Sequence, residues 1–79
     1  MDDLEGRVKG LFVHSFDMEP GEVISAANLK GDLGMDSTEV VELVLALEKE
    51  FDVKLADGEV TNKHCVADVV KVIKDKRDR

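Results

Sequence analysis

The sequence predicts an all-α fold, a small four-helix bundle with three main helices, one short helix and a long first loop. Apolar residues recur at helical spacing in three separate segments, and breakers gather between the first two of them. A chain of 79 residues has room for one hydrophobic core, so we expect one domain over residues 1–79 and no deep catalytic cleft.

The first helix is expected over residues 3–15. Asp2 and Asp3 stand at its start, where negative charge is favoured by the positive end of a helix dipole. Its apolar face is made of residues three and four positions apart, namely Leu4, Val8, Leu11 and Phe12.

About twenty residues follow before the next helix, and their breakers are Pro20, Gly21, Gly31 and Gly34. A loop of this length in a small domain either serves a function or indicates a misassigned element. Apolar residues spaced along it predict that it is pinned to the core at several points, and these are Val23, Ile24, Leu29 and Leu33.

The second helix is expected over residues 37–51. Asp36 is placed to cap it, and Glu39 completes a capping box three positions later. One stripe of this helix forms the core face, made of Val40, Leu43, Val44, Leu47 and Phe51. At 100° per residue Val41 and Leu45 fall outside that stripe, beside acidic residues, and this pattern predicts a partner-binding ridge.

A turn near Asp57 and Gly58 and a short helical turn over 58–63 are expected next. The last helix is predicted over 66–76, with Val66, Val69, Val70 and Ile73 on its core face. Because valine is a poor helix former, a strand through Val70 and Val72 stays open as an alternative.

The net charge of −7 argues against nucleic acid as a ligand, because phosphate binding needs a basic surface. Residues 71–79 carry five bases and two acids, so the acidic excess lies in the rest of the chain. It is densest in 32–52, where seven acids face the single base Lys49. This segment predicts docking to basic partner proteins.

A lone cysteine, Cys65, excludes an internal disulfide. The N-terminus lacks the layout of a signal peptide, and no apolar run reaches membrane-spanning length. We therefore expect a cytoplasmic protein that does not contact membranes, although an organelle protein whose transit segment has been removed would look identical. We also expect a monomer.

Ser37 stands where a serine usually caps a helix. Asp36 is the better cap, which leaves the Ser37 hydroxyl free at the positive end of the helix dipole. A catalytic serine is not predicted, because GMDSTE is not a G-x-S-x-G motif and neither His14 nor His64 is placed as its base. The acids also lack the spacing of a calcium loop, so no metal site is predicted.

The stretch GDLGMDSTEVVELVLALEKEF, residues 31–51, resembles the attachment region of acyl carrier proteins, which are small four-helix proteins. The D-L-G of residues 32–34 matches the family's loop, and Asp36-Ser37 matches its attachment pair. The V-E-L-V, A-L-E and E-F pieces of the helix match in the same order, and the likeness extends over nearly the whole chain.

The resemblance implies a non-catalytic carrier with covalent 4′-phosphopantetheine on Ser37, flanked by Asp36 and attached by a phosphopantetheinyl transferase. The thiol of that arm would carry acyl groups as thioesters between enzymes of fatty acid or a related specialised acyl (polyketide or lipid) biosynthesis. Its partners would include acyltransferases, ketosynthases and other acyl-processing enzymes with basic docking surfaces.

The resemblance also assigns two groups of residues. The docking face would comprise Asp36, Glu39, Val41, Glu42, Leu45 and Glu48. The lining of an acyl pocket would include Leu29, Val44, Leu47, Leu55, Val60, Val69 and Ile73, all of which also suit ordinary core packing.

Three residues depart from the family pattern. Thr38 replaces a leucine, Lys63 an apolar residue near the inner end of the pocket, and Cys65 a capping threonine. These departures leave a specialised pathway as open as general fatty acid synthesis. Two other functions also stay open, an unmodified acidic helical adaptor for basic proteins and an aminoacyl or peptidyl carrier.

Overall fold

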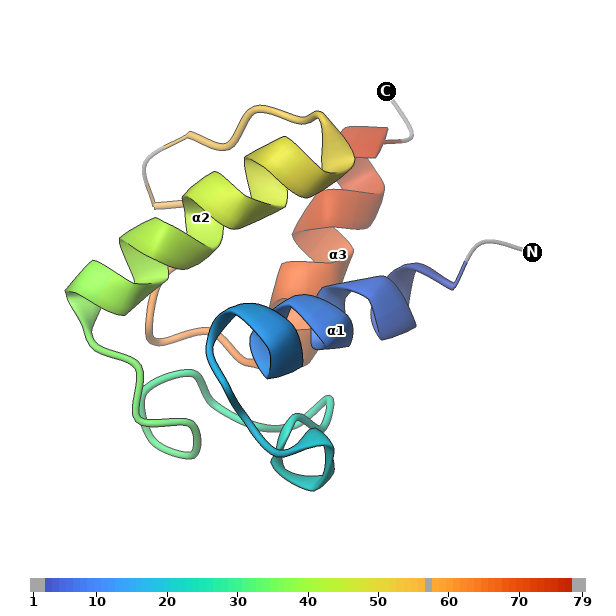
Figure 1. Ribbon diagram of the computed structural model, residues 1–79. Coiled ribbons are helices and arrows are strands. Elements are labelled where there is room, and N and C mark those ends of the chain that lie inside the picture. The colour runs from blue at the N-terminus through green and yellow to red at the C-terminus, as the bar shows by residue number, and fades with distance from the viewer. Residues whose placement is uncertain (1–2, 57, 78–79) are drawn as a thin grey trace.

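The computed structural model describes residues 3–56 and 58–77, and the predictions for Asp2 and Asp57 lie outside these ranges. Its elements in order are α1 (Leu4–Ser15), the 3-10 helix η1 (Pro20–Glu22), α2 (Ser37–Phe51) and α3 (Val66–Arg77). In Figure 1, α1 crosses in front of the lower part of α3, and α2 lies to the upper left of both. The first loop lies below the three helices. The predicted all-helical class and its main helices are confirmed.

The helices share one apolar core. α1 contacts α2, α3 and η1, and α2 contacts α3. The fully buried side chains with the largest volumes come from the three α-helices and from the first loop, and they include Phe12, Leu29, Met35, Leu43, Leu47 and Ile73. The expected core stripes of α1, α2 and α3 all pack here, with Leu4, Leu11, Val44 and Val70 only partly buried.

The short helix was predicted at the wrong place. It is η1, inside the first loop, where Pro20 occupies the first turn and Glu19 and Glu22 form a capping box. Residues 58–63 form bends and turns instead, and Gly58 at their start has a φ of +88°, outside the helical range. The Thr61 N–H then donates to Nδ1 of His64 at 3.0 Å and closes the following turn.

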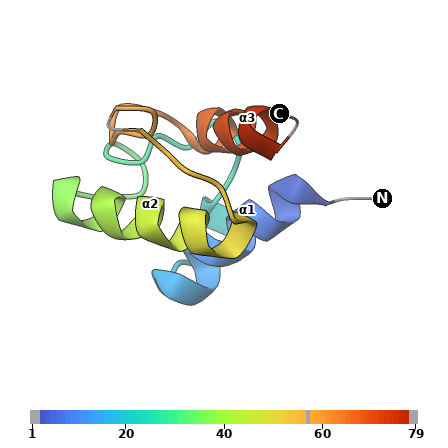
Figure 2. The ribbon, with the colours of Figure 1, turned by 90° about the horizontal axis from the view of Figure 1, so that it is seen from above.

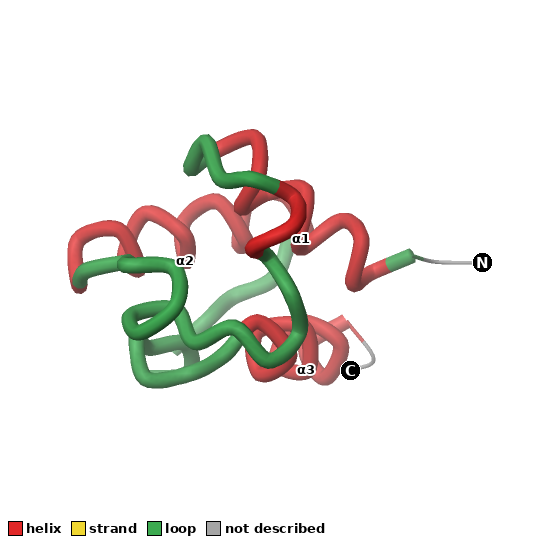
Figure 3. The backbone as a smooth tube through the Cα atoms, turned by 90° about the horizontal axis from the view of Figure 1, so that it is seen from below, coloured by secondary structure: helices red, strands yellow, loops and turns green. Residues whose placement is uncertain are grey.

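The first loop is held by backbone bonds to the chain before and at the start of α3. Leu29 N–H donates to the carbonyl of His64 at 3.0 Å, and Val66 N–H donates to the carbonyl of Ala27 at 2.9 Å. Asn28 and Cys65 form an isolated antiparallel bridge between these bonds. Figure 3 shows the two loop segments running side by side next to α3. The loop is therefore part of the folded body.

Two further expectations from the sequence are wrong, one about the burial of a side chain and one about secondary structure. Ile24 was expected to pin the loop to the core but is 54% exposed, because the turn closed by Ala27 N–H on its carbonyl directs Val23 and Ala27 inward instead. The strand alternative at Val70 and Val72 is wrong, since both residues lie inside α3.

The start of α3 is stabilised by Asp68 in place of a capping side chain at Cys65. The Asp68 carboxylate accepts from the Cys65 N–H at 3.0 Å and from its thiol at 3.3 Å. These two bonds, backbone first, lower the pKa of the Asp68 carboxyl below its usual value, and the charges of His64 and Lys71 act in the same direction.

Asp68→Ala is expected to lower the free energy of unfolding at neutral pH by about 1 kcal/mol, because it removes the acceptor at the helix start. The pKa of Asp68 is lower in the folded than in the unfolded chain. Its stabilisation is therefore present above the unfolded pKa and is lost as the pH falls through the folded pKa. The difference between wild type and variant should shrink accordingly in urea unfolding at decreasing pH. Asp75→Ala, on the same helix, is the control, and equal losses in both variants would contradict this role.

Candidate functional site

Ser37 is the first residue of α2, and its position is fixed by a capping box. Asp36 accepts from the Glu39 N–H at 2.8 Å, and Glu39 accepts from the Asp36 N–H at 3.2 Å. Asp36 has extended backbone dihedrals, as expected of a residue that precedes a helix. The predicted cap and the predicted bounds of this helix are both confirmed.

The residues just before Asp36 anchor this helix start to the core. Met35 is buried, and its N–H donates to the carbonyl of Leu29 at 2.8 Å. Gly34 has a φ of +68°, which favours glycine, and it lets the loop turn immediately before the buried residue. The loop also contains a turn at residues 28–31. The side-chain oxygen of Asn28 stabilises this turn by accepting from the N–H groups of Lys30 and Gly31.

The Ser37 side chain is exposed, and within the described part of the chain its hydroxyl makes no hydrogen bond. It borders a small hollow of about 190 Å³, lined by Ser37, Val40, Val60, Thr61 and Asn62, here called the Ser37 hollow. The hydroxyl is therefore open to an incoming group, with space beside it.

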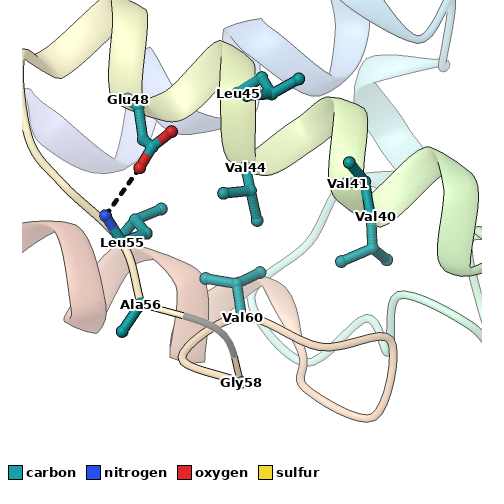
Figure 4. A pocket seen from close by; sticks show the side chains of 9 residues that line it. All are labelled: Val40, Val41, Val44, Leu45, Glu48, Leu55, Ala56, Gly58 and Val60. Carbon is teal, nitrogen blue, oxygen red and sulfur yellow. Dashed lines mark hydrogen bonds between the residues drawn. The ribbon is translucent and has the colours of Figure 1, made fainter.

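A larger groove runs along α2 from the same point. It has a volume of about 330 Å³, is here called the α2 groove, and is lined by Val40, Val41, Val44, Leu45, Glu48, Leu55, Ala56, Gly58 and Val60. Figure 4 shows Val44 of α2 and Val60 of the opposite loop pointing toward each other across it. Because Val40 and Val60 line both cavities, the Ser37 hollow and the α2 groove adjoin.

The structure divides the seven residues expected in an acyl pocket into two groups. Three of them line the α2 groove: Val44, Leu55 and Val60. The other four are fully buried in the closed core: Leu29, Leu47, Val69 and Ile73. The sequence did not point to Ala56 and Gly58, which also line the groove and belong to no periodic apolar pattern.

The ridge predicted on α2 is present as exposed apolar surface. Val41 is 58% exposed and Leu45 is 60% exposed, although the opposite face of the same helix packs in the core. Large apolar side chains left this exposed on adjacent turns are typical of a partner-binding surface. Together with Glu42 and Glu48 they are here called the α2 ridge.

The four predicted docking acids are not equivalent. Asp36 and Glu39 are engaged in the capping box, and the Glu48 carboxylate accepts from the Leu55 N–H at 2.9 Å. Glu42 is exposed and has no ion pair or hydrogen bond to any described residue. Glu42 is thus the acid whose charge is most available to a partner.

The residues that depart from the family pattern lie outside the α2 groove. Thr38 is exposed beside Ser37, and Lys63 is exposed with its backbone carbonyl accepting from the Asn28 side chain at 3.0 Å. Cys65 is partly buried at the start of α3. None of the three lines either cavity.

A family model described as a phosphopantetheine attachment site matches residues 7–73. Acyl carrier proteins from two strains of Caulobacter vibrioides are each 38% identical to this chain over 76 residues, covering 96% of this chain and 97% of the relative. The chain belongs to the acyl carrier protein family. Acyl carrier proteins are carriers and not catalysts, and their cofactor is covalently attached 4′-phosphopantetheine.

The start of α2 fits such a group. A phosphate there would lie at the positive end of the α2 dipole, beside backbone N–H groups of the first turn that have no intrahelical acceptor. The Ser37 hollow gives the phosphate room.

Within residues 3–56 and 58–77, every helix is too short or too polar to traverse a bilayer.

Asp36→Ala is expected to lower the free energy of unfolding by about 1 kcal/mol, because the Glu39 N–H loses its acceptor. Asp36→Asn should stay within a few tenths of a kcal/mol of wild type, because its amide oxygen accepts the same bond. Urea unfolding measures both, and an Asn variant as unstable as the Ala variant would show that charge, and not the cap, fixes this helix start.

Proposed function

We propose that Ser37 bears the phosphopantetheine arm and that this acyl carrier protein moves acyl groups between enzymes as thioesters on the arm's thiol. The observation that supports this most is the exposed, unbonded hydroxyl at the first position of α2, held in place by the capping box and by Met35. A phosphopantetheinyl transferase would need access to this oxygen, and no described side chain covers it.

The cargo is proposed to lie in the α2 groove when no partner is bound. The groove adjoins the Ser37 hollow through Val40 and Val60, so an arm that starts at Ser37 can fold back along α2. Most of its lining is aliphatic. Burial there would favour an apolar acyl chain by about 0.8 kcal/mol for each methylene removed from water.

Partner enzymes are proposed to bind the α2 ridge. Val41 and Leu45 provide apolar contact, and Glu42 and the adjoining acids attract the Lys and Arg side chains of acyltransferases and ketosynthases. Exposed ion pairs contribute only about 0–1 kcal/mol each, which suits a carrier that must release each partner quickly.

The pathway is proposed to be fatty acid synthesis or a related specialised acyl (polyketide or lipid) pathway, with the protein acting as a monomer in the cytoplasm. The aliphatic groove favours acyl cargo over aminoacyl or peptidyl groups. The exposed α2 ridge also fits an unmodified adaptor for basic proteins, which would not need Ser37.

The attachment is tested by incubating the purified chain with coenzyme A, magnesium and a broad-range phosphopantetheinyl transferase, followed by intact mass spectrometry. Wild type should gain the mass of one phosphopantetheine, and Ser37→Ala should gain none. Thr38→Ala, which removes the neighbouring hydroxyl, is the control and should be modified like wild type. No gain in wild type with several transferases, together with full cellular activity of Ser37→Ala, would favour the adaptor.

Docking is tested by charge reversal. Glu42→Lys should lower kcat/KM for arm transfer about tenfold at low salt, because it removes attraction on the α2 ridge, and the deficit should shrink as salt increases. Asp75→Lys changes the net charge equally on α3 and should have little effect. If both variants lose the same activity, the total charge of the protein and not the ridge governs association.

A further inference from the structure

The α2 ridge and the α2 groove have residues in common. Val41, Leu45 and Glu48 are spaced four and three positions apart on α2, and all three line the groove. They are therefore also one rim of the cavity, as Figure 4 shows. A protein seated on the ridge would touch the edge of the cavity.

The opposite wall of the groove is formed by Leu55, Ala56, Gly58 and Val60, and two polar contacts attach this part of the chain to the helices. At one end the Leu55 N–H donates to Oε2 of Glu48 on α2 at 2.9 Å. At the other end Glu59 forms an ion pair with Nζ of Lys76 on α3, at 2.8 Å. In Figure 2 the chain that leaves α2, up to residue 56, passes between α2 and α3.

Glu48 occupies an unusual place for an acid. It lies in the last turn of α2, where the helix dipole disfavours negative charge. Its backbone carbonyl accepts from the Asp52 and Val53 N–H groups, and its carboxylate accepts from Leu55. Glu48 thus determines the path of the chain as it leaves α2 and enters the wall of the groove.

We propose that Glu48 is a positioning residue that couples partner docking to opening of the α2 groove. In the free protein its carboxylate holds Leu55 against α2. A basic side chain of a docked partner competes for the same carboxylate, which frees the Leu55 N–H and loosens the wall. The hydrogen bond between the Glu48 carboxylate and the Leu55 N–H is here called the latch, and it does not depend on the proposed function. The release of an acyl chain by the loosened wall rests on the proposed function.

The latch is tested by amide hydrogen exchange, measured by NMR on the full chain without the arm. Glu48→Ala should speed exchange at Leu55 about tenfold, because its acceptor is lost. Exchange at Val53 should change little, because that N–H donates to the Glu48 backbone carbonyl. Glu48→Gln should keep exchange at Leu55 near the wild-type rate, since an amide oxygen still accepts, and Glu42→Ala is the control on the same ridge. Unchanged exchange at Leu55 in Glu48→Ala would overturn the latch.

The coupling is tested with a hexa-arginine peptide as the basic probe. At low salt the peptide should speed exchange at Leu55 relative to Val53 in wild type, and the effect should be lost in Glu48→Gln, whose neutral side chain does not attract the probe. Lys76→Met loosens the other end of the wall and should still respond to the peptide. No response in wild type, or an equal response in Glu48→Gln, would overturn the coupling. A chain that gains no phosphopantetheine mass would instead refute the proposed function and leave these exchange results standing.

Discussion

The rest of the structure depends on where α2 begins, and that point is set by one buried side chain and one backbone bond. Met35 fills the core beneath the loop, and its N–H bond to Leu29 places Asp36 where it must cap the helix. Ser37 then follows as the first helical residue. Its apolar neighbours Met35 and Val40 point into the core, whereas the Ser37 side chain is exposed.

The parts of this arrangement that depend on local chemistry could be predicted from the sequence. α2 runs from Ser37 to Phe51 as expected, because its capping residues and its apolar period are both local signals. The path of residues 58–63 could not be predicted, since it depends on the positive φ of Gly58 and on a bond between Thr61 and His64. The same holds for the groove, whose open side is set by the path of that loop.

Charge patterns in the sequence also conceal how individual acids are used. The sequence predicts that Asp36 and Glu39 each accept a backbone N–H at the start of α2, and the structure confirms it. It does not predict that the Glu48 carboxylate accepts from the Leu55 N–H beyond the end of the helix. Only that contact distinguishes Glu48 from Glu42. An acidic helix face in a small protein can therefore be partly a set of backbone caps, and counting its charges overstates what remains for a partner.

The backbone bonds between the first loop and residues 64–67 join parts of the chain that are far apart in sequence. During synthesis on the ribosome, Leu29 and Ala27 emerge long before His64 and Val66, the residues to which they bond. A nascent chain that ends before residue 62 would lack these supports, so the loop under Ser37 would be held only by the bonds within it. Completion of the polypeptide would thereby become a condition for presenting the serine in the geometry described.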